Sequence, residues 1–90
     1  MKVRLQAGGM DETFEAPNAD ALLKMAKAEA AKRLPLLKRS VVKAMPDLTF
    51  AGEIVKKHNE KNKASDAAPK SAREFVEWAQ KAGYITVIEE

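Results

Sequence analysis

The chain has no cysteine, and only one of its 90 residues is a histidine. The absence of cysteine excludes a disulfide framework, a thiolate metal site and a cysteine nucleophile. It is typical of a protein in a reducing compartment, and we therefore expect a cytoplasmic location. The histidine, His58, follows Lys56 and Lys57 in a hydrophilic segment. Because a general base needs a partner that orients it and a substrate within reach, we interpret His58 as an ordinary, partly exposed side chain.

Long apolar runs are also missing. No stretch approaches the roughly 20 apolar residues that a membrane span requires, and we expect neither a span nor a secretory signal. Aromatic residues make up 6% of the chain, and 16 of its hydrophobic residues are Ala. The core of this single domain is therefore expected to be small, because a chain of this length buries only about two thirds of its unfolded surface. A small core favours stabilisation by a second copy or by another protein.

The motifs of common enzyme classes and metal sites are absent from the sequence. The Gly8-Gly9 pair lacks the further glycines and the helix start of a phosphate-binding loop, and it indicates a turn. No serine lies in a Gly-x-Ser-x-Gly motif. Asp11 and Glu15 would share one face of a strand while Glu12 points away, which is typical of a solvated hairpin edge. We predict a non-catalytic protein that uses no cofactor and no metal ion.

The beginning of the chain predicts a β-hairpin. Residues 1–7 alternate between apolar and polar side chains, which is typical of a strand with one buried face. Residues 12–16 predict the returning strand, with Phe14 inward. Lys2 and Arg4 would then face the two glutamates of the second strand.

The middle of the chain predicts helices separated by prolines. Asn18 is a suitable N-cap for a helix over residues 19–33. Pro35 cannot continue that helix, so a second helix over residues 35–44 is expected, with a single kinked helix as the alternative. Asp47 or Thr49 can cap a third helix that runs to about Lys61, although residues 48–55 also fit a strand. The predicted inner face of this third helix consists of Leu48, Ala51, Ile54, Val55 and His58.

The end of the chain predicts a helix followed by a strand. Ser71 and Glu74 match a capping box, and Gly83 is a typical helix stop. Residues 84–88 are β-branched and aromatic, with apolar side chains on both faces. We expect them to form a strand beside the first one, either central or covered on both faces.

These elements together predict an α+β fold in which a small three-stranded sheet packs against about four helices, in the order ββααααβ. The predicted segments are a β-hairpin (1–17), a basic helical region (18–61), a flexible loop (62–70) and a final helix with the C-terminal strand (71–90).

Charge is sorted along the chain. Residues 24–63 carry eleven Lys or Arg and four Asp or Glu, a net charge of +7, whereas residues 1–23 and 64–90 each carry −2. A basic helical face of this kind attracts phosphate backbones. It is also typical of helices that are merely soluble. The candidate residues for polyanion binding are Lys24, Lys27, Lys32, Arg33, Lys38, Arg39, Lys43, Lys56 and Lys57.

Two binding functions follow from this sequence. The first, which we favour, is a protein-interaction or homodimer module in which Trp78 and Tyr84 serve as interface anchors. The second is binding of nucleic acid or another polyanion by the basic helical face. Only two of the seven basic residues on the first two predicted helices are Arg, and base-stacking aromatic residues are scarce there, which weighs against the second function.

Overall fold

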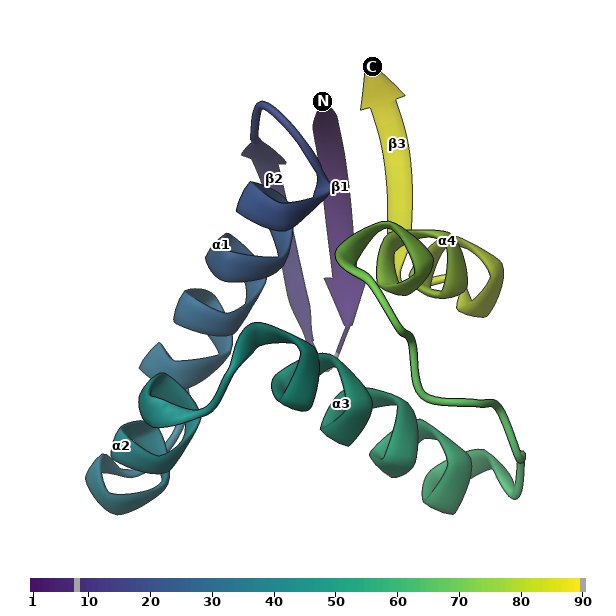
Figure 1. Ribbon diagram of the computed structural model, residues 1–90. Helices are drawn as coiled ribbons and strands as arrows, with labels where there is room; N and C mark the ends of the chain where they lie inside the picture. The colour runs from purple at the N-terminus through teal and green to yellow at the C-terminus, as the bar shows by residue number, and fades with distance from the viewer. Residues whose placement is uncertain (8, 90) are drawn as a thin grey trace.

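Residues 1–7 and 9–89, as described by a computed structural model, form a three-stranded antiparallel sheet and four helices (Figure 1). The predicted α+β fold and the order ββααααβ are confirmed. The strands are β1 (Lys2–Ala7), β2 (Met10–Glu15) and β3 (Ile85–Glu89), and the helices are α1 (Ala19–Lys32), α2 (Leu36–Ala44), α3 (Asp47–Asn62) and α4 (Ala72–Ala82). The helices α1 and α4 pack against the sheet, while α2 and α3 lie near one end of it (Figure 1).

The sheet has the order β2-β1-β3, so β1 is its central strand. Val3 of β1 lies opposite Phe14 on one side and Val87 on the other. The last strand does lie beside the first, as expected. Its predicted central or doubly covered position is wrong, because β1 already occupies the centre and Ile88 on the outer face is 49% exposed.

The outer face of the hairpin is polar and carries the ion pair between Arg4 and Asp11. Lys2 lies opposite Glu15 as expected, but Arg4 lies opposite Thr13. The guanidinium of Arg4 instead donates two hydrogen bonds to the carboxylate of Asp11, at 2.9 and 2.7 Å. These bonds hold the pKa of Asp11 below its ordinary value.

The turn between β1 and β2 contains one residue that the structure describes. Gly9 has a φ of +83°, a conformation that glycine adopts without strain. Gly8, the other half of the predicted turn, lies outside the described residues. β2 begins at Met10, two positions earlier than predicted.

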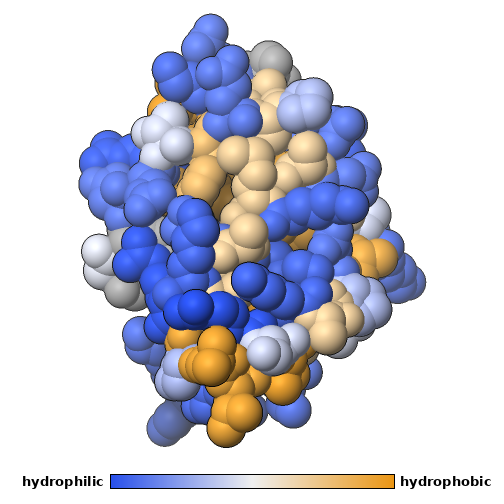
Figure 2. All heavy atoms as spheres, turned by 90° about the vertical axis from the view of Figure 1, so that its left-hand side faces the viewer, coloured by the Kyte–Doolittle hydropathy of each residue, from blue (hydrophilic) through white to orange (hydrophobic). Residues whose placement is uncertain are grey.

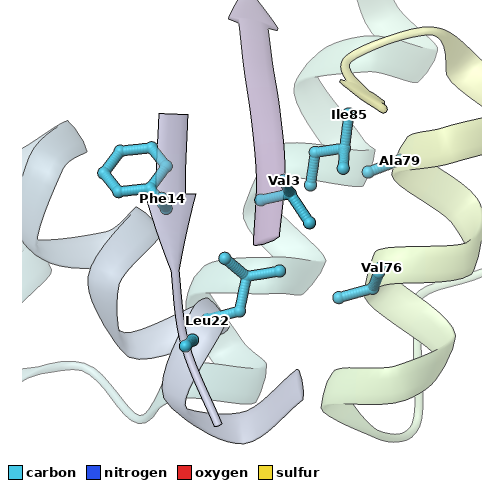
Figure 3. Close-up of a cluster of buried hydrophobic side chains, with 7 residues drawn as sticks. Val3, Phe14, Leu22, Val76, Ala79 and Ile85 are labelled. Atoms are coloured by element: carbon cyan, nitrogen blue, oxygen red, sulfur yellow. The ribbon is translucent and has the colours of Figure 1, made fainter. Parts of the chain in front are cut away.

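The core lies between the sheet and the helices α1 and α4. Figure 3 shows Val3 and Ile85 of the sheet pointing toward Leu22 of α1 and Val76 of α4. A second cluster, around Leu23, Phe50 and Phe75, joins α1, α3 and α4. Full burial of one such large side chain stabilises the fold by about 1.5–3 kcal/mol. The few large residues are thus divided between two small clusters.

The ends of α1 and α4 follow the predicted signals. The side-chain oxygen of Asn18 accepts a hydrogen bond from the backbone of Ala21 at 2.9 Å. The hydroxyl of Ser71 accepts one from the backbone of Glu74 at 3.1 Å. At the end of α4, Gly83 has a φ of +87°, which only glycine adopts readily.

The middle of the chain contains two separate helices, α2 and α3, as predicted, and residues 48–55 are helical. The N-cap of α3 is Pro46, not Asp47 or Thr49, and no side chain caps this helix end. Asp47 lies within the first turn, where its carboxylate contacts the ammonium group of Lys27 at 2.8 Å. The carboxylate of Asp47, predicted as a possible N-cap, thus pairs with a lysine of another helix.

The predicted inner face of α3 is partly wrong. Phe50, Ala51 and Val55 are buried, whereas Leu48 is 43% exposed. Leu48 and Phe50 are two positions apart, which places them about 200° apart around a helix. With Phe50 inward, Leu48 must therefore face solvent. No helix among residues 1–7 and 9–89 combines the length and apolar character needed to cross a membrane.

Candidate interaction surface

The most exposed large apolar side chains of the described chain lie together on α2. Leu36, Leu37 and Val41 are 73%, 84% and 62% exposed. In Figure 2, which views the molecule from the left of Figure 1, strongly hydrophobic side chains gather at the lower end, where α2 lies. Hydrophilic side chains border them. We call these three residues the α2 patch.

The helix α2 is held in place by side chains other than the α2 patch. The guanidinium of Arg39 donates hydrogen bonds to the backbone oxygens of Ala31, Lys32 and Leu34 at 3.1, 3.3 and 3.4 Å. A cation at these carbonyls is favourable because the C-terminal end of α1 carries negative dipole charge. On the inward side, Val42 packs against the cluster that contains Phe50. The α2 patch is therefore not needed to hold α2 in place.

A groove of about 360 Å³ lies between α2 and α3 and adjoins the end of α1. Its apolar lining includes Val42 and Ile54, and two exposed lysines, Lys38 and Lys57, also line it. Glu53 is the acidic residue of the lining. The groove thus combines an apolar wall with a net positive charge.

The nine candidate polyanion-binding residues fall into three groups. Three of them pair with carboxylates: Lys27 with Asp47 at 2.8 Å, Lys32 with Glu29 at 3.4 Å and Arg33 with Glu12 at 3.2 Å. Arg39 caps α1 as described above. The remaining five, Lys24, Lys38, Lys43, Lys56 and Lys57, have no ion pair among the described residues. The structure brings Lys38 and Lys57 together at the groove.

The two candidate anchors, Trp78 and Tyr84, lie in one aromatic cluster with His58. The ring of His58 stands edge-on to both of them, with centroids 5.1 Å from Trp78 and 5.6 Å from Tyr84. Its Nδ1 atom lies 2.8 Å from the hydroxyl of Tyr84. Trp78 and Tyr84 are half-buried, and these internal contacts occupy much of their surface. Their role as interface anchors stays a prediction.

Asp66 ties the predicted flexible loop, residues 62–70, to this cluster. Its carboxylate accepts a hydrogen bond from the indole of Trp78 at 2.9 Å and lies 3.6 Å from Nε2 of His58. Its backbone exchanges two hydrogen bonds with the side chain of Asn59, at 2.9 and 3.0 Å. Sequence reasoning missed this network. The available signal was the indole N–H of Trp78, which needs a partner when its ring is partly buried.

The arrangement of His58 beside Asp66 and Tyr84 resembles the acid–base pairs of enzymes, but the polar atoms of these three side chains contact one another. Both ring nitrogens have a neighbour within the cluster, and the side chain of His58 is 16% exposed. The groove between α2 and α3 is not lined by His58. Among the described residues, no three metal-ligating side chains gather at one point. The cluster joins α3, the loop and α4.

No protein-family model, curated protein or solved structure matches the chain. Function can therefore be inferred only from the geometry and chemistry of the chain itself.

Proposed function

We propose that this protein is a non-catalytic interaction module that binds another protein through the α2 patch. The observation that supports this proposal is the exposure of Leu36, Leu37 and Val41 on one short helix. Contiguous apolar side chains of this kind mark interaction sites on soluble proteins. Their burial against a partner would favour association by about 25 cal/mol for each Å² removed from water, from which the entropic cost of association is subtracted.

The charge around the α2 patch favours an acidic partner. On a helical wheel at 100° per residue, Lys38 and Lys43 fall on opposite sides of the α2 patch. A second copy of the chain that docked on the same surface would bring these lysines close to their counterparts, and like charges across an interface cost affinity. A partner with an apolar ridge flanked by Asp or Glu would pair with them instead.

The α2 patch alone is too small to form the interface of a stable complex. A helix of nine residues is only about 14 Å long. A standard interface buries about 800 Å² on each partner. We therefore place the rest of the contact along the groove between α2 and α3, where Lys57 adds a further positive charge. An amphipathic helix with acidic flanks fits this combination of groove and patch.

The proposal is tested by site-specific photo-crosslinking in the cells that produce the protein. A photoreactive amino acid is placed at position 37 on α2 and, as the control, at position 80, an exposed site on α4. We expect a discrete protein adduct from position 37 alone. An adduct with the mass of two chains would support self-association instead. The absence of any adduct specific to position 37 would overturn the proposal.

Affinity for the captured protein provides the quantitative test. The purified partner is titrated against the wild type, Leu37→Ser and the control variant Ile88→Ser, which changes an exposed apolar residue on the outer sheet face. We expect Leu37→Ser to weaken binding at least tenfold and Ile88→Ser to leave it unchanged. Equal affinity of all three chains would place the contact elsewhere.

The alternative function is polyanion binding, and the lysines at the groove favour it. Lys38 and Lys57 line one groove, and the candidates Lys24, Lys43 and Lys56 are exposed on α1, α2 and α3. A polyanion binder would retard DNA or RNA at low salt and release it steeply between about 50 and 200 mM salt. The Lys38→Glu/Lys57→Glu double variant would abolish that shift. A wild-type chain that causes no shift at low salt would exclude this alternative.

A further inference from the structure

The core contains a cavity of about 140 Å³ at the junction of the two hydrophobic clusters. It lies among β1, α1, α3, α4 and the start of β3, and its lining is almost entirely apolar. Four aromatic residues, Phe50, Phe75, Trp78 and Tyr84, contribute to its walls. This cavity is distinct from the α2 patch and was not anticipated from the sequence.

The cavity exists because α1 presents small side chains toward it. Ala26 and Ala30 are one helical turn apart on α1, and both line the cavity. Residues at this spacing share one face of a helix. Leucines there would project into the space that the two alanines leave. The high Ala content of the chain thus produces a local void and not a uniformly thin core.

The lining has a buried floor and a partly exposed rim. Phe50, Phe75 and Ile85 are buried, whereas Leu5 and Ile54 are half-buried. The remaining exposure of the rim provides a route for a small molecule to enter. The floor lets that molecule lose most of its contact with water.

The polar atoms of the aromatic walls are already bonded within the protein. The hydroxyl of Tyr84 lies 2.8 Å from His58, and the indole N–H of Trp78 donates to Asp66 at 2.9 Å. A molecule in the cavity therefore meets ring faces and edges and aliphatic side chains. A polar group on that molecule would lose its hydration without gaining a hydrogen bond, which is unfavourable.

From this geometry we infer that the cavity is a binding site for a small, uncharged aromatic molecule of one ring. An apolar cavity of about 150 Å³ in another protein stays dry and binds benzene, so the volume here matches a single ring. Aromatic side chains around such a ring provide edge-to-face and stacked contacts. The cavity shares Ala30, Phe50 and Ile54 with the groove between α2 and α3, but this inference does not depend on the protein-interaction function proposed above.

The experiment uses toluene as the probe and benzoate as its charged counterpart. Binding is followed by two-dimensional NMR of the full chain, with shifts of the cavity-lining amides as the readout. We expect saturable binding of toluene and at least tenfold weaker binding of benzoate. Absence of saturable toluene binding, or equal affinity for the two molecules, would overturn the inference.

Matched alanine variants locate the site. Ala26→Leu fills the cavity and, unlike Ala30, Ala26 does not line the groove between α2 and α3. Ala28→Leu places the same side chain on an exposed position of α1 and serves as the control. We expect Ala26→Leu to weaken toluene binding at least tenfold and Ala28→Leu to leave it unchanged.

Unchanged toluene binding in Ala26→Leu would place the site outside the cavity and refute the inference. If Ala26→Leu does not fold, as judged by its circular dichroism, Ala30→Leu takes its place with the same expected loss. The comparison of toluene with benzoate on the wild type tests the inference even if neither variant folds.

Discussion

Removal of the Asp66 side chain tests how the loop after α3 is held. In Asp66→Ala the indole N–H of Trp78 loses its acceptor, while the backbone of residue 66 keeps both hydrogen bonds to Asn59. A hydrogen bond to a charged group contributes about 1.5–3 kcal/mol when it is shielded from water. The side chain of Asp66 is 44% exposed, so the contribution expected here is lower, about 1 kcal/mol. For a chain of this length, that loss corresponds to a fall of about 4–8 °C in the unfolding midpoint.

A double-mutant cycle isolates the contribution of this one bond. Asp66→Ala, Trp78→Phe and the double variant are unfolded in urea and followed by circular dichroism, because the only tryptophan is removed in two of them. We expect a coupling free energy of about 1 kcal/mol between the two positions. Asp66→Asn, which retains a side-chain oxygen, should lose less stability than Asp66→Ala.

The reasoning would be refuted by additive effects. A coupling free energy below about 0.3 kcal/mol would mean that the bond between Trp78 and Asp66 does not stabilise the fold. The loop would then be held by the bonds to Asn59 and by the contact of Asp66 with His58. Amide hydrogen exchange over residues 64–70 should rise in Asp66→Ala if the anchor is effective.

Three further predictions follow from features of the fold. Leu37→Ser should change the free energy of unfolding by less than about 0.5 kcal/mol because the side chain is exposed; a loss above 1.5 kcal/mol in urea unfolding would show that the α2 patch is buried in solution. Gly83→Ala should cost about 1–2 kcal/mol because φ is +87°. Gly52→Ala, inside α3, should instead gain about 0.5–1 kcal/mol, and equal effects in thermal unfolding would contradict the assigned backbone conformations. An NMR titration should find the pKa of Asp11 below its ordinary value, and Arg4→Gln should raise it toward that value. The stabilisation from this pair is present above the ordinary pKa of an aspartate and is lost as the pH falls through the lowered pKa; a titration unchanged by Arg4→Gln would contradict the pairing.

Local signals made most of the secondary structure predictable from the sequence. Ser71 and Gly83 mark the two ends of α4, and both act through backbone groups within a few residues of themselves. Pro35 separates α1 from α2 for an equally local reason, since its ring cannot be accommodated within a helix. The start of α1, both ends of α4 and the break between α1 and α2 were therefore predicted correctly.

Features that depend on distant partners could not be placed in this way. Asp47 pairs with Lys27 on α1. In the orientation that α3 adopts with this contact, Phe50 is buried, whereas the sequence predicted that Leu48 would face inward. The edge position of β3 depends on β1 pairing with both other strands. An apolar run has the same sequence pattern whether its strand is central or at an edge.

The candidate interaction surface was predictable only in part. The basic character of α2 follows from composition, and Lys38 remains exposed. The sequence could not show that α2 turns Leu37 and Val41 to solvent, because an amphipathic helix has the same spacing whether it covers a core or awaits a partner. Arg33 and Lys27 pair with carboxylates that are 21 and 20 positions away in the chain, and these carboxylates offset their charge on the basic face.

The antiparallel pairing of β1 with β3 brings the two ends of the chain together. Lys2 lies opposite Glu89, and both ends emerge at the side of the molecule remote from α2 (Figure 1). A fluorophore, affinity tag or neighbouring domain fused at either end would leave the groove and its lysines unobstructed. The same closeness would allow a short peptide to link the two ends, so that new termini could be opened in the loop near Asp66 without disturbing the sheet.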